Sequence, residues 1–194
     1  MERCGEKEEE AWKNDHWGEH RNLSGANICT GPLKISPIDW RQETSSTLRI
    51  FRTLTDASLA QRVTGEGRSL GFLAWHITKS LGEMGDRAGL HVPVPADDIS
   101  MPAKAADIVG TYLSAARSLG DEVRQHWNNS SLEEEVDMYG EKWKRGFALA
   151  ALVRHQTHHR GQMTVLMRQA GLSVPGVCGP SKEEWARWGM PAKE

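Results

Sequence analysis

The stretch RHQTHHRGQMTVLMRQAG, from Arg154 to Gly171, decides how this sequence folds and where its chemistry lies. At about 100° per residue, His155 and His159 fall within about 40° of each other on a helical wheel. They share this face with apolar side chains of the kind that a helix buries against its neighbours, namely Leu152, Met163 and Leu166. The pattern predicts a long amphipathic helix with two imidazoles in its buried stripe.

Two imidazoles in an apolar stripe have two interpretations. In the first, each ring is a core residue that hydrogen bonds a backbone carbonyl or a facing side chain, because an unpaired buried polar group costs roughly 1–3 kcal/mol. In the second, both rings bind one divalent cation, since the i, i+4 spacing brings two ring nitrogens to the same side of a helix. Residue 156 is a glutamine, so the motif is not H-E-x-x-H and the general base of a zinc protease is absent.

A third histidine, His76 in GFLAWHITKSLGE, is the candidate ligand from another helix. Taken alone, it would be a core or interface residue; with the other two histidines it completes a set of three. Three neutral imidazoles leave at least one coordination position of a cation open, which is typical of catalytic sites. Glu83 lies seven residues further along the same face. We expect it to be a solvated charge, with a base or an outer partner of the site as the alternative.

Four amphipathic segments and no clear strand alternation predict an all-α bundle. The first helix begins near Pro37, because proline suits the first helical position. Residues 132–143 are acidic and fit either an extended segment or a short helix. A last short helix is expected to begin at Ser181, with Glu184 completing a capping box. The other predicted helices span residues 69–89, 103–127 and 144–170.

Composition favours a globular cytoplasmic protein. The 194 residues carry 24 Lys and Arg against 26 Asp and Glu, a balance that gives no reason to expect nucleic acid or an anionic membrane as a partner. The apolar stretches are too short to span a bilayer, and the charged N-terminus lacks the apolar core of a signal peptide. Three scattered cysteines indicate reduced, structural thiols. We expect residues 1–34 to be a polar, flexible extension and residues 35–190 to form the domain.

The same helical wheel predicts the positions of the other polar side chains after residue 154. His158 lies about 60° outside the histidine pair and is expected at the rim of the stripe. Arg160 points away from the stripe, which favours a salt bridge at the surface or at a dimer interface. Gln162 falls beside the histidines, where a contact with a ligand or metal and a helix–helix contact fit equally well. Cys178, in the loop after this helix, is expected to be structural.

Three segments together are similar to a known family. SLGFLAWHITKSLGE, followed about eighty residues later by LVRHQTHHRGQMTVLMRQAG, resembles the DinB/YfiT-like family of metal-binding four-helix bundles. The tail CGPSKEEWARWG and the position of Trp40 in the first helix are similar to features of the same family. The H-x-x-x-H-R-G-Q core is the most specific of these motifs. The resemblance covers residues 37–189 and leaves the N-terminal segment unaccounted for.

The resemblance implies a DinB-like four-helix bundle with long crossover connections, a short C-terminal helix and homodimeric packing. It assigns the metal ligands to His76, His155 and His159 and implies a divalent ion, zinc or nickel first, with manganese or iron as alternatives. Some members resemble thiol S-transferases that use a low-molecular-weight thiol, and a hydrolase would use the same three ligands. We therefore expect a metal-dependent enzyme with a small-molecule substrate. A non-catalytic stress-response protein that binds a metal or a small ligand is the alternative from another class.

Overall fold

Four long helices form the body of the domain in the computed structural model, which describes residues 37–192. They are α2 (Pro37–Phe51), α3 (Leu70–Arg87), α4 (Ala105–His126) and α5 (Arg145–Gln169). The short elements are η1 (Asp56–Ala60), η2 (Ser131–Glu133), β1 (Glu135–Met138), β2 (Glu141–Lys144) and η3 (Lys182–Trp188). The prediction of an all-α bundle is confirmed. The extension predicted over residues 1–34 lies outside the described residues.

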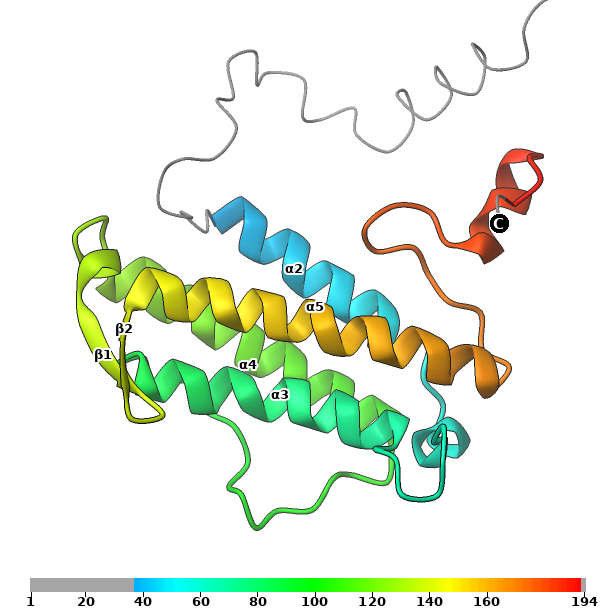
Figure 1. Cartoon of the computed structure of the whole chain (residues 1–194), viewed down its shortest axis with the longest axis horizontal. Coiled ribbons are helices and arrows are strands. Elements are labelled where there is room, and N and C mark those ends of the chain that lie inside the picture. Colours follow the sequence, from blue (N-terminus) through cyan, green and yellow to red (C-terminus); the bar gives the residue numbers. More distant parts are fainter. Residues whose placement is uncertain (1–36, 193–194) are drawn as a thin grey trace, which may run out of the picture. The chain divides into compact units, whose positions relative to one another are not determined.

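The order of the helices around the bundle explains why two of its connections cross an end of the bundle. α3 and α5 lie side by side in Figure 1, and α4 packs against both α3 and α2. Since α2 also packs against α5, the order around the bundle is α2–α4–α3–α5. Two pairs of consecutive helices, α2 with α3 and α4 with α5, therefore lie diagonally opposite, and the chain must cross an end of the bundle to join each pair; α3 and α4 are neighbours. Within the described residues, no helix is long and apolar enough to cross a membrane.

The core fills the space between the four helices. Each helix contributes fully buried side chains, for example Phe51, Ile77, Ile108 and Leu152. Phe51 of α2 and Tyr112 of α4 meet edge to face, with ring centroids 5.0 Å apart. Such aromatic pairs add about 0.5–1.5 kcal/mol beyond the area that they bury.

The segment between α4 and α5 is a β-hairpin. β1 pairs with β2 in antiparallel register, with Val136 opposite Trp143. The two turn residues, Tyr139 and Gly140, both have positive φ, at 60° and 87°. A two-residue turn with positive φ at both positions matches the twist of the flanking strands. Of the two structures that the sequence left open for residues 132–143, the extended one is therefore correct, apart from the turn of η2.

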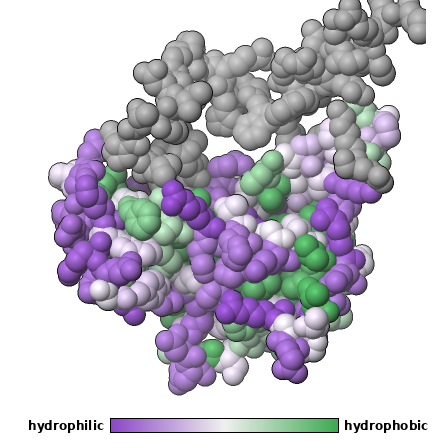
Figure 2. Space-filling model, in the orientation of Figure 1, coloured by the Kyte–Doolittle hydropathy of each residue, from purple (hydrophilic) through white to green (hydrophobic). Residues whose placement is uncertain are grey.

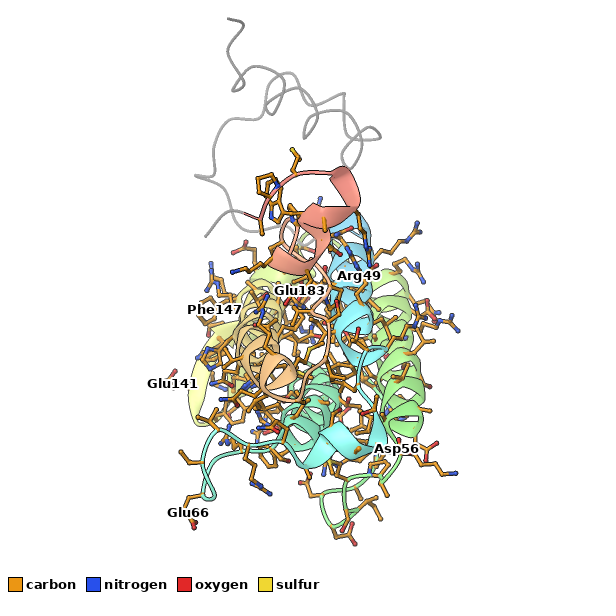
Figure 3. The ribbon with its side chains drawn as sticks, turned by 90° about the vertical axis from the view of Figure 1, so that its right-hand side faces the viewer. Arg49, Asp56, Glu66, Glu141, Phe147 and Glu183 are labelled. Carbon is orange, nitrogen blue, oxygen red and sulfur yellow. The ribbon has the colours of Figure 1, made fainter. Side chains whose placement is uncertain are left out.

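The starts of α4 and η3 are held by side-chain hydrogen bonds, the first from a distant residue and the second from within η3. The Asp56 carboxylate accepts a hydrogen bond from the Ala105 backbone N–H, at 2.8 Å, and so caps the start of α4 (Figure 3). η3 begins after Ser181, as predicted, although it is a 3₁₀ rather than an α-helix; the Glu184 carboxylate accepts a hydrogen bond from the Ser181 N–H, at 3.3 Å. Glu184 also pairs with Arg49 of α2, at 3.3 Å, which ties the C-terminal segment to the bundle.

A glycine in α3 makes room for the connection to α4. A Cβ added at Gly82 would lie 2.2 Å from Val94 Cγ2 and 3.0 Å from the Val92 carbonyl oxygen. We expect Gly82→Ala to lower the free energy of unfolding by roughly 1–3 kcal/mol, because overpacking against Val92 and Val94 outweighs the helix propensity of alanine. Urea denaturation monitored by circular dichroism measures this change.

Gly110 provides the matched control for that substitution. It lies in the middle of α4, and a Cβ there would meet nothing within 4 Å. Gly110→Ala is therefore expected to raise stability by up to about 1 kcal/mol. Equal effects of the two substitutions would contradict the role given to Gly82.

Candidate metal site

The three predicted histidines meet between α3 and α5. His76 projects from α3, and His155 and His159 project from α5, one helical turn apart. The His155 Nε2 atom lies 3.0 Å from His76 Nε2 and 3.1 Å from His159 Nε2. One ring nitrogen from each residue lies within 4.8 Å of the others. The helix spacing thus brings together all three residues that the sequence singled out.

The His159 ring is oriented by a neighbour on its own helix. Its Nδ1 atom lies 2.7 Å from the amide oxygen of Gln162. Because that oxygen only accepts hydrogen bonds, Nδ1 carries the proton and the lone pair of Nε2 points at the other two histidines. The amide oxygen of Gln162 thus has a role that the sequence analysis did not list, since it fixes the tautomer of a neighbouring histidine.

The His76 ring is packed against Phe72, one turn earlier on α3. The two rings are stacked, with centroids 5.9 Å apart and planes 13° from parallel. Phe72 is 43% exposed although it is apolar, so one side of this stack faces solvent. The site is therefore open on the side of Phe72, while His159 is only 4% exposed.

Hydrogen bonds alone do not account for the surroundings of the two ring nitrogens of His155. A neutral imidazole has one N–H, and Nε2 of His155 faces two other ring nitrogens. Its Nδ1 is buried and has no hydrogen-bond partner among the described residues. By comparison, two nitrogens bound to one ion at about 2.0–2.1 Å lie about 2.9–3.4 Å apart for octahedral to tetrahedral angles. The separations of His155 Nε2 from the other two Nε2 atoms, at 3.0 and 3.1 Å, fall within that range.

All three histidines favour the neutral form, which is the form that binds metals. Burial is the largest cause of the lowered pKa of each ring. Repulsion between the imidazoles lowers the pKa of His76 and His155 further, to about 4 for His155. The positive charge of Arg68 acts in the same direction on all three rings.

These pKa shifts predict that the metal-free protein loses stability in mild acid. A histidine whose pKa is lower in the folded state binds fewer protons than in the unfolded state, so folding is favoured above about pH 6.5 and less favoured as pH falls toward 4. We expect the melting temperature in a chelator to fall between pH 7.5 and pH 5, and the fall to be smaller in His155→Gln. His126→Gln, at an exposed histidine of α4, is the control and should fall like wild type. Parallel curves for His155→Gln and wild type would contradict the prediction.

The side of α5 turned toward α2 carries a buried polar network that the sequence analysis missed. Arg160 is 2% exposed and forms a two-pronged ion pair with Glu43 of α2, whose Nη2–Oε2 distance is 3.2 Å. Its Nη1 also donates to the Thr47 hydroxyl at 2.8 Å. Gln156, fully buried, accepts a hydrogen bond from the Tyr112 hydroxyl at 2.8 Å. The expectation that Arg160 would form a surface or dimer-interface salt bridge is therefore wrong, because α5 packs against α2 as well as α3.

The remaining candidates lie away from the cluster's centre. His158 is exposed, as predicted, with its ring 4.9 Å from that of His159. Glu83 is also exposed, as expected for a solvated charge, and hydrogen bonds the Tyr139 side chain. Cys178 is a free, exposed thiol in the loop after α5.

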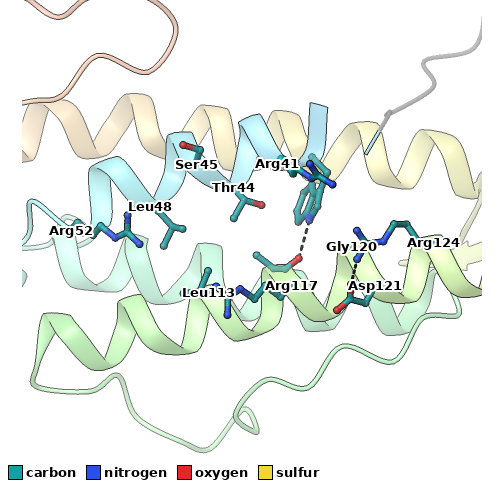
Figure 4. Close-up of a pocket in the computed structure, with 12 residues that line it drawn as sticks. Arg41, Thr44, Ser45, Leu48, Arg52, Leu113, Arg117, Gly120, Asp121 and Arg124 are labelled. Carbon is teal, nitrogen blue, oxygen red and sulfur yellow. Dashed lines mark hydrogen bonds and ion pairs between the residues drawn. The ribbon is translucent and has the colours of Figure 1, made fainter. Parts of the chain in front are cut away.

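A shallow pocket on another side of the bundle lies between α2 and α4 (Figure 4). Its volume is about 340 Å³. Trp40 and Leu48 supply apolar walls, and the Trp40 indole N–H donates to the Ala116 carbonyl at 2.9 Å. Arginines line it as well, at positions 41, 52, 117 and 124. None of the three clustered histidines lines this pocket, so it is a feature separate from the α3–α5 site.

The surface around α3 and α5 is mostly hydrophilic and is interrupted by apolar patches (Figure 2). Exposed large apolar side chains on these two helices are Phe72, Phe147 and Val165. Figure 3 shows Phe147 projecting outward from the start of α5. Its ring contacts Trp143 of the hairpin, with centroids 4.9 Å apart.

The fold and the histidine cluster define a class of protein: a four-helix bundle with crossover connections and three converging imidazoles between two of its helices. The chain belongs to the DinB family, whose model matches residues 38–192. It is 40% identical over 153 residues to the uncharacterized protein YrdA of Bacillus subtilis, covering 79% of this chain and 92% of that protein.

Solved structures agree with this assignment. A DinB-like protein from Bacillus cereus has a TM-score of 0.69 and 36% identity, covering 72% of this chain and 93% of the other. A second DinB-like protein, YjoA of Bacillus subtilis, has a TM-score of 0.59 and 17% identity, over 73% of this chain and 96% of that one; at this identity the likeness concerns the fold alone. Membership in the family and three histidines close to one another are together compatible with metal binding.

Proposed function

We propose that His76, His155 and His159 bind one divalent metal ion, and that the protein is an enzyme that activates a thiol or water at this site. The observation that carries the proposal is the convergence of the three Nε2 atoms, at 3.0 and 3.1 Å, around His155. Three imidazoles are a common donor set for zinc and nickel, with manganese and iron as alternatives.

The chain's own residues prepare this site for a cation in two ways. Burial keeps the pKa of the three imidazoles low, so their lone pairs are free near neutral pH. Gln162 holds the proton of His159 on Nδ1 and leaves Nε2 facing the cluster. A bound ion would supply Lewis-acid chemistry, which lowers the pKa of a thiol or of water at a position that the protein leaves open. The exposed side of the Phe72–His76 stack gives a small-molecule substrate access to that position.

Metal content of the purified protein tests this proposal. We expect about one divalent ion per chain in wild type by mass spectrometry and none in His155→Ala or His159→Ala, because two imidazoles hold an ion far more weakly than three. His158→Ala is the matched control, since it removes an exposed imidazole that neighbours His159. A wild-type protein that contains no metal, and gains none from added zinc, nickel or manganese, would overturn the proposal.

A thiol S-transferase that uses a low-molecular-weight thiol is the specific activity we propose first, and a hydrolase is the second. Thiol consumption with a panel of electrophiles distinguishes both from a non-catalytic protein that only holds a metal or a small ligand in a stress response. We further propose that the protein acts in the cytoplasm as a homodimer, without nucleic acid or membrane partners. Analytical ultracentrifugation measures the oligomeric state.

A further inference from the structure

We infer that Arg68 is the anion-binding residue of the three-histidine site, and that ligands of this site carry a carboxylate or another negatively charged group. The inference rests on the proposed function, because it takes the cluster as the place where a ligand binds. It adds a residue that neither the histidine motif nor the resemblance singles out, and it names a class of ligand.

Arg68, which lies just before α3, forms a continuous column with Phe72 and His76 of that helix. Arg68 immediately precedes Ser69, the N-cap of the helix. Its guanidinium carbon lies 5.1 Å from the centroid of the Phe72 ring, and the Phe72 ring is in turn stacked on His76. Contact with an aromatic ring restrains a guanidinium group while its N–H donors stay accessible. The column leads from solvent to the first of the three imidazoles.

Arg68 is also available for a ligand. Its side chain is exposed, and it forms no ion pair within residues 37–192. Three of the four arginines of α5 are already paired: Arg145 with Glu134, Arg160 with Glu43 and Arg168 with Glu183. A guanidinium group presents a planar fork of donors that matches a carboxylate, so an unpaired one beside a ligand site favours anionic ligands.

The charges along α3 determine how an anionic ligand would be oriented at the site. Arg68 lies at the start of the column, just before the helix, whereas Glu83 lies seven residues beyond His76 on the same helix. Lys79, the other cation on this stretch, is paired with Asp97 at 2.7 Å. The positive charge of this stretch that is not ion-paired, that of Arg68, therefore lies at the Phe72 end of the column. A ligand at the imidazoles would place its anionic group over Phe72, toward Arg68.

Binding of two small thiols to the cobalt-loaded full-length protein tests this inference. 3-Mercaptopropionate carries a carboxylate and 2-mercaptoethanol is neutral, and the thiolate-to-cobalt absorption band reports the binding of each. The measured quantity is the ratio of their dissociation constants. We expect Arg68→Gln to reduce the preference for 3-mercaptopropionate by about three- to tenfold, as for one partly exposed charge-assisted pair, and Arg68→Glu to reduce it further. High salt should weaken the wild-type preference.

Arg154→Gln is the matched control. It removes the same charge from an exposed position next to His155 in sequence, but Arg154 belongs to α5 and is not part of the column of Arg68, Phe72 and His76. It should keep the wild-type ratio. An unchanged ratio in Arg68→Gln, or a cobalt spectrum that neither thiol alters, would overturn the inference while leaving metal binding intact. Failure of the wild-type protein to bind cobalt would instead count against the proposed function itself.

Discussion

Replacing Arg160 by methionine is expected to lower the free energy of unfolding by about 3–5 kcal/mol. The Glu43 side chain, 12% exposed, would then keep a carboxylate in the interior without its partner. The arginine also donates to Thr47 at 2.8 Å and to Thr157 at 3.0 Å, and methionine satisfies neither hydroxyl. Removing one partner of a buried pair is more costly than the pair is stabilising, because the remaining charge is left desolvated.

Urea denaturation of three variants measures this effect and separates its causes. Glu43→Gln should also be destabilising, since it leaves the Arg160 guanidinium without a counter-charge. The double variant, Glu43→Gln with Arg160→Met, should lose less than the sum of the two single changes, because neither charge then remains unpaired.

The pair of Arg168 and Glu183 gives the control for burial. It has a similar two-pronged geometry, at 2.8 and 3.0 Å, but the Arg168 side chain is 45% exposed. Arg168→Met should therefore cost no more than about 1 kcal/mol. If Arg160→Met and Arg168→Met proved equally mild, the buried network would not be what fixes α5 against α2.

The buried network around Arg160 is the part of this region that could not be predicted from the sequence. A helical wheel that assumes a single buried face identified the side of α5 that packs against α3, and His155 and His159 lie on that side. It could not identify a second buried face, because Gln156 and Arg160 are residues that usually lie in solvent. Their burial depends on Glu43 and Tyr112, which are far away in sequence. A polar residue directly after each of the two clustered histidines of α5 was the available signal, and it can be interpreted only when the position of α2 is known.

Features whose causes lie within a few residues could be predicted from the sequence, and features that depend on distant residues could not. Helix ends near Ser69, Ser181 and Gly171 depend on caps and glycine breaks within a few residues, and the predicted boundaries agree with the structure to within two or three residues. The N-terminus of α4 is capped by Asp56, which is distant in sequence, so no pattern near the start of α4 predicts this cap. The column of Arg68 and Phe72 beside His76 follows helical spacing and could have been read from the sequence.

Zinc should stabilise the folded protein by an amount that the histidine cluster determines. At a free concentration about 1,000 times the dissociation constant, a ligand that binds only the folded state adds about 4 kcal/mol. For a chain of this size, that corresponds to a rise in melting temperature of roughly 8–16 °C. We expect this rise in wild type and in His158→Ala, and none in His155→Ala, because His155 Nε2 is the atom that both other imidazoles face.

Gln162→Leu distinguishes a metal site from a hydrogen-bonded cluster of histidines. The substitution removes the acceptor that keeps the His159 proton on Nδ1, but it leaves all three candidate ligands in the chain. Loss of such an outer partner typically weakens metal binding 10- to 100-fold, so the zinc-induced rise should shrink without disappearing. In a metal-free cluster, zinc would change the melting temperature of none of these variants. A full rise in His155→Ala would mean that zinc binds elsewhere, and a full rise in Gln162→Leu would mean that the tautomer of His159 is fixed by other contacts.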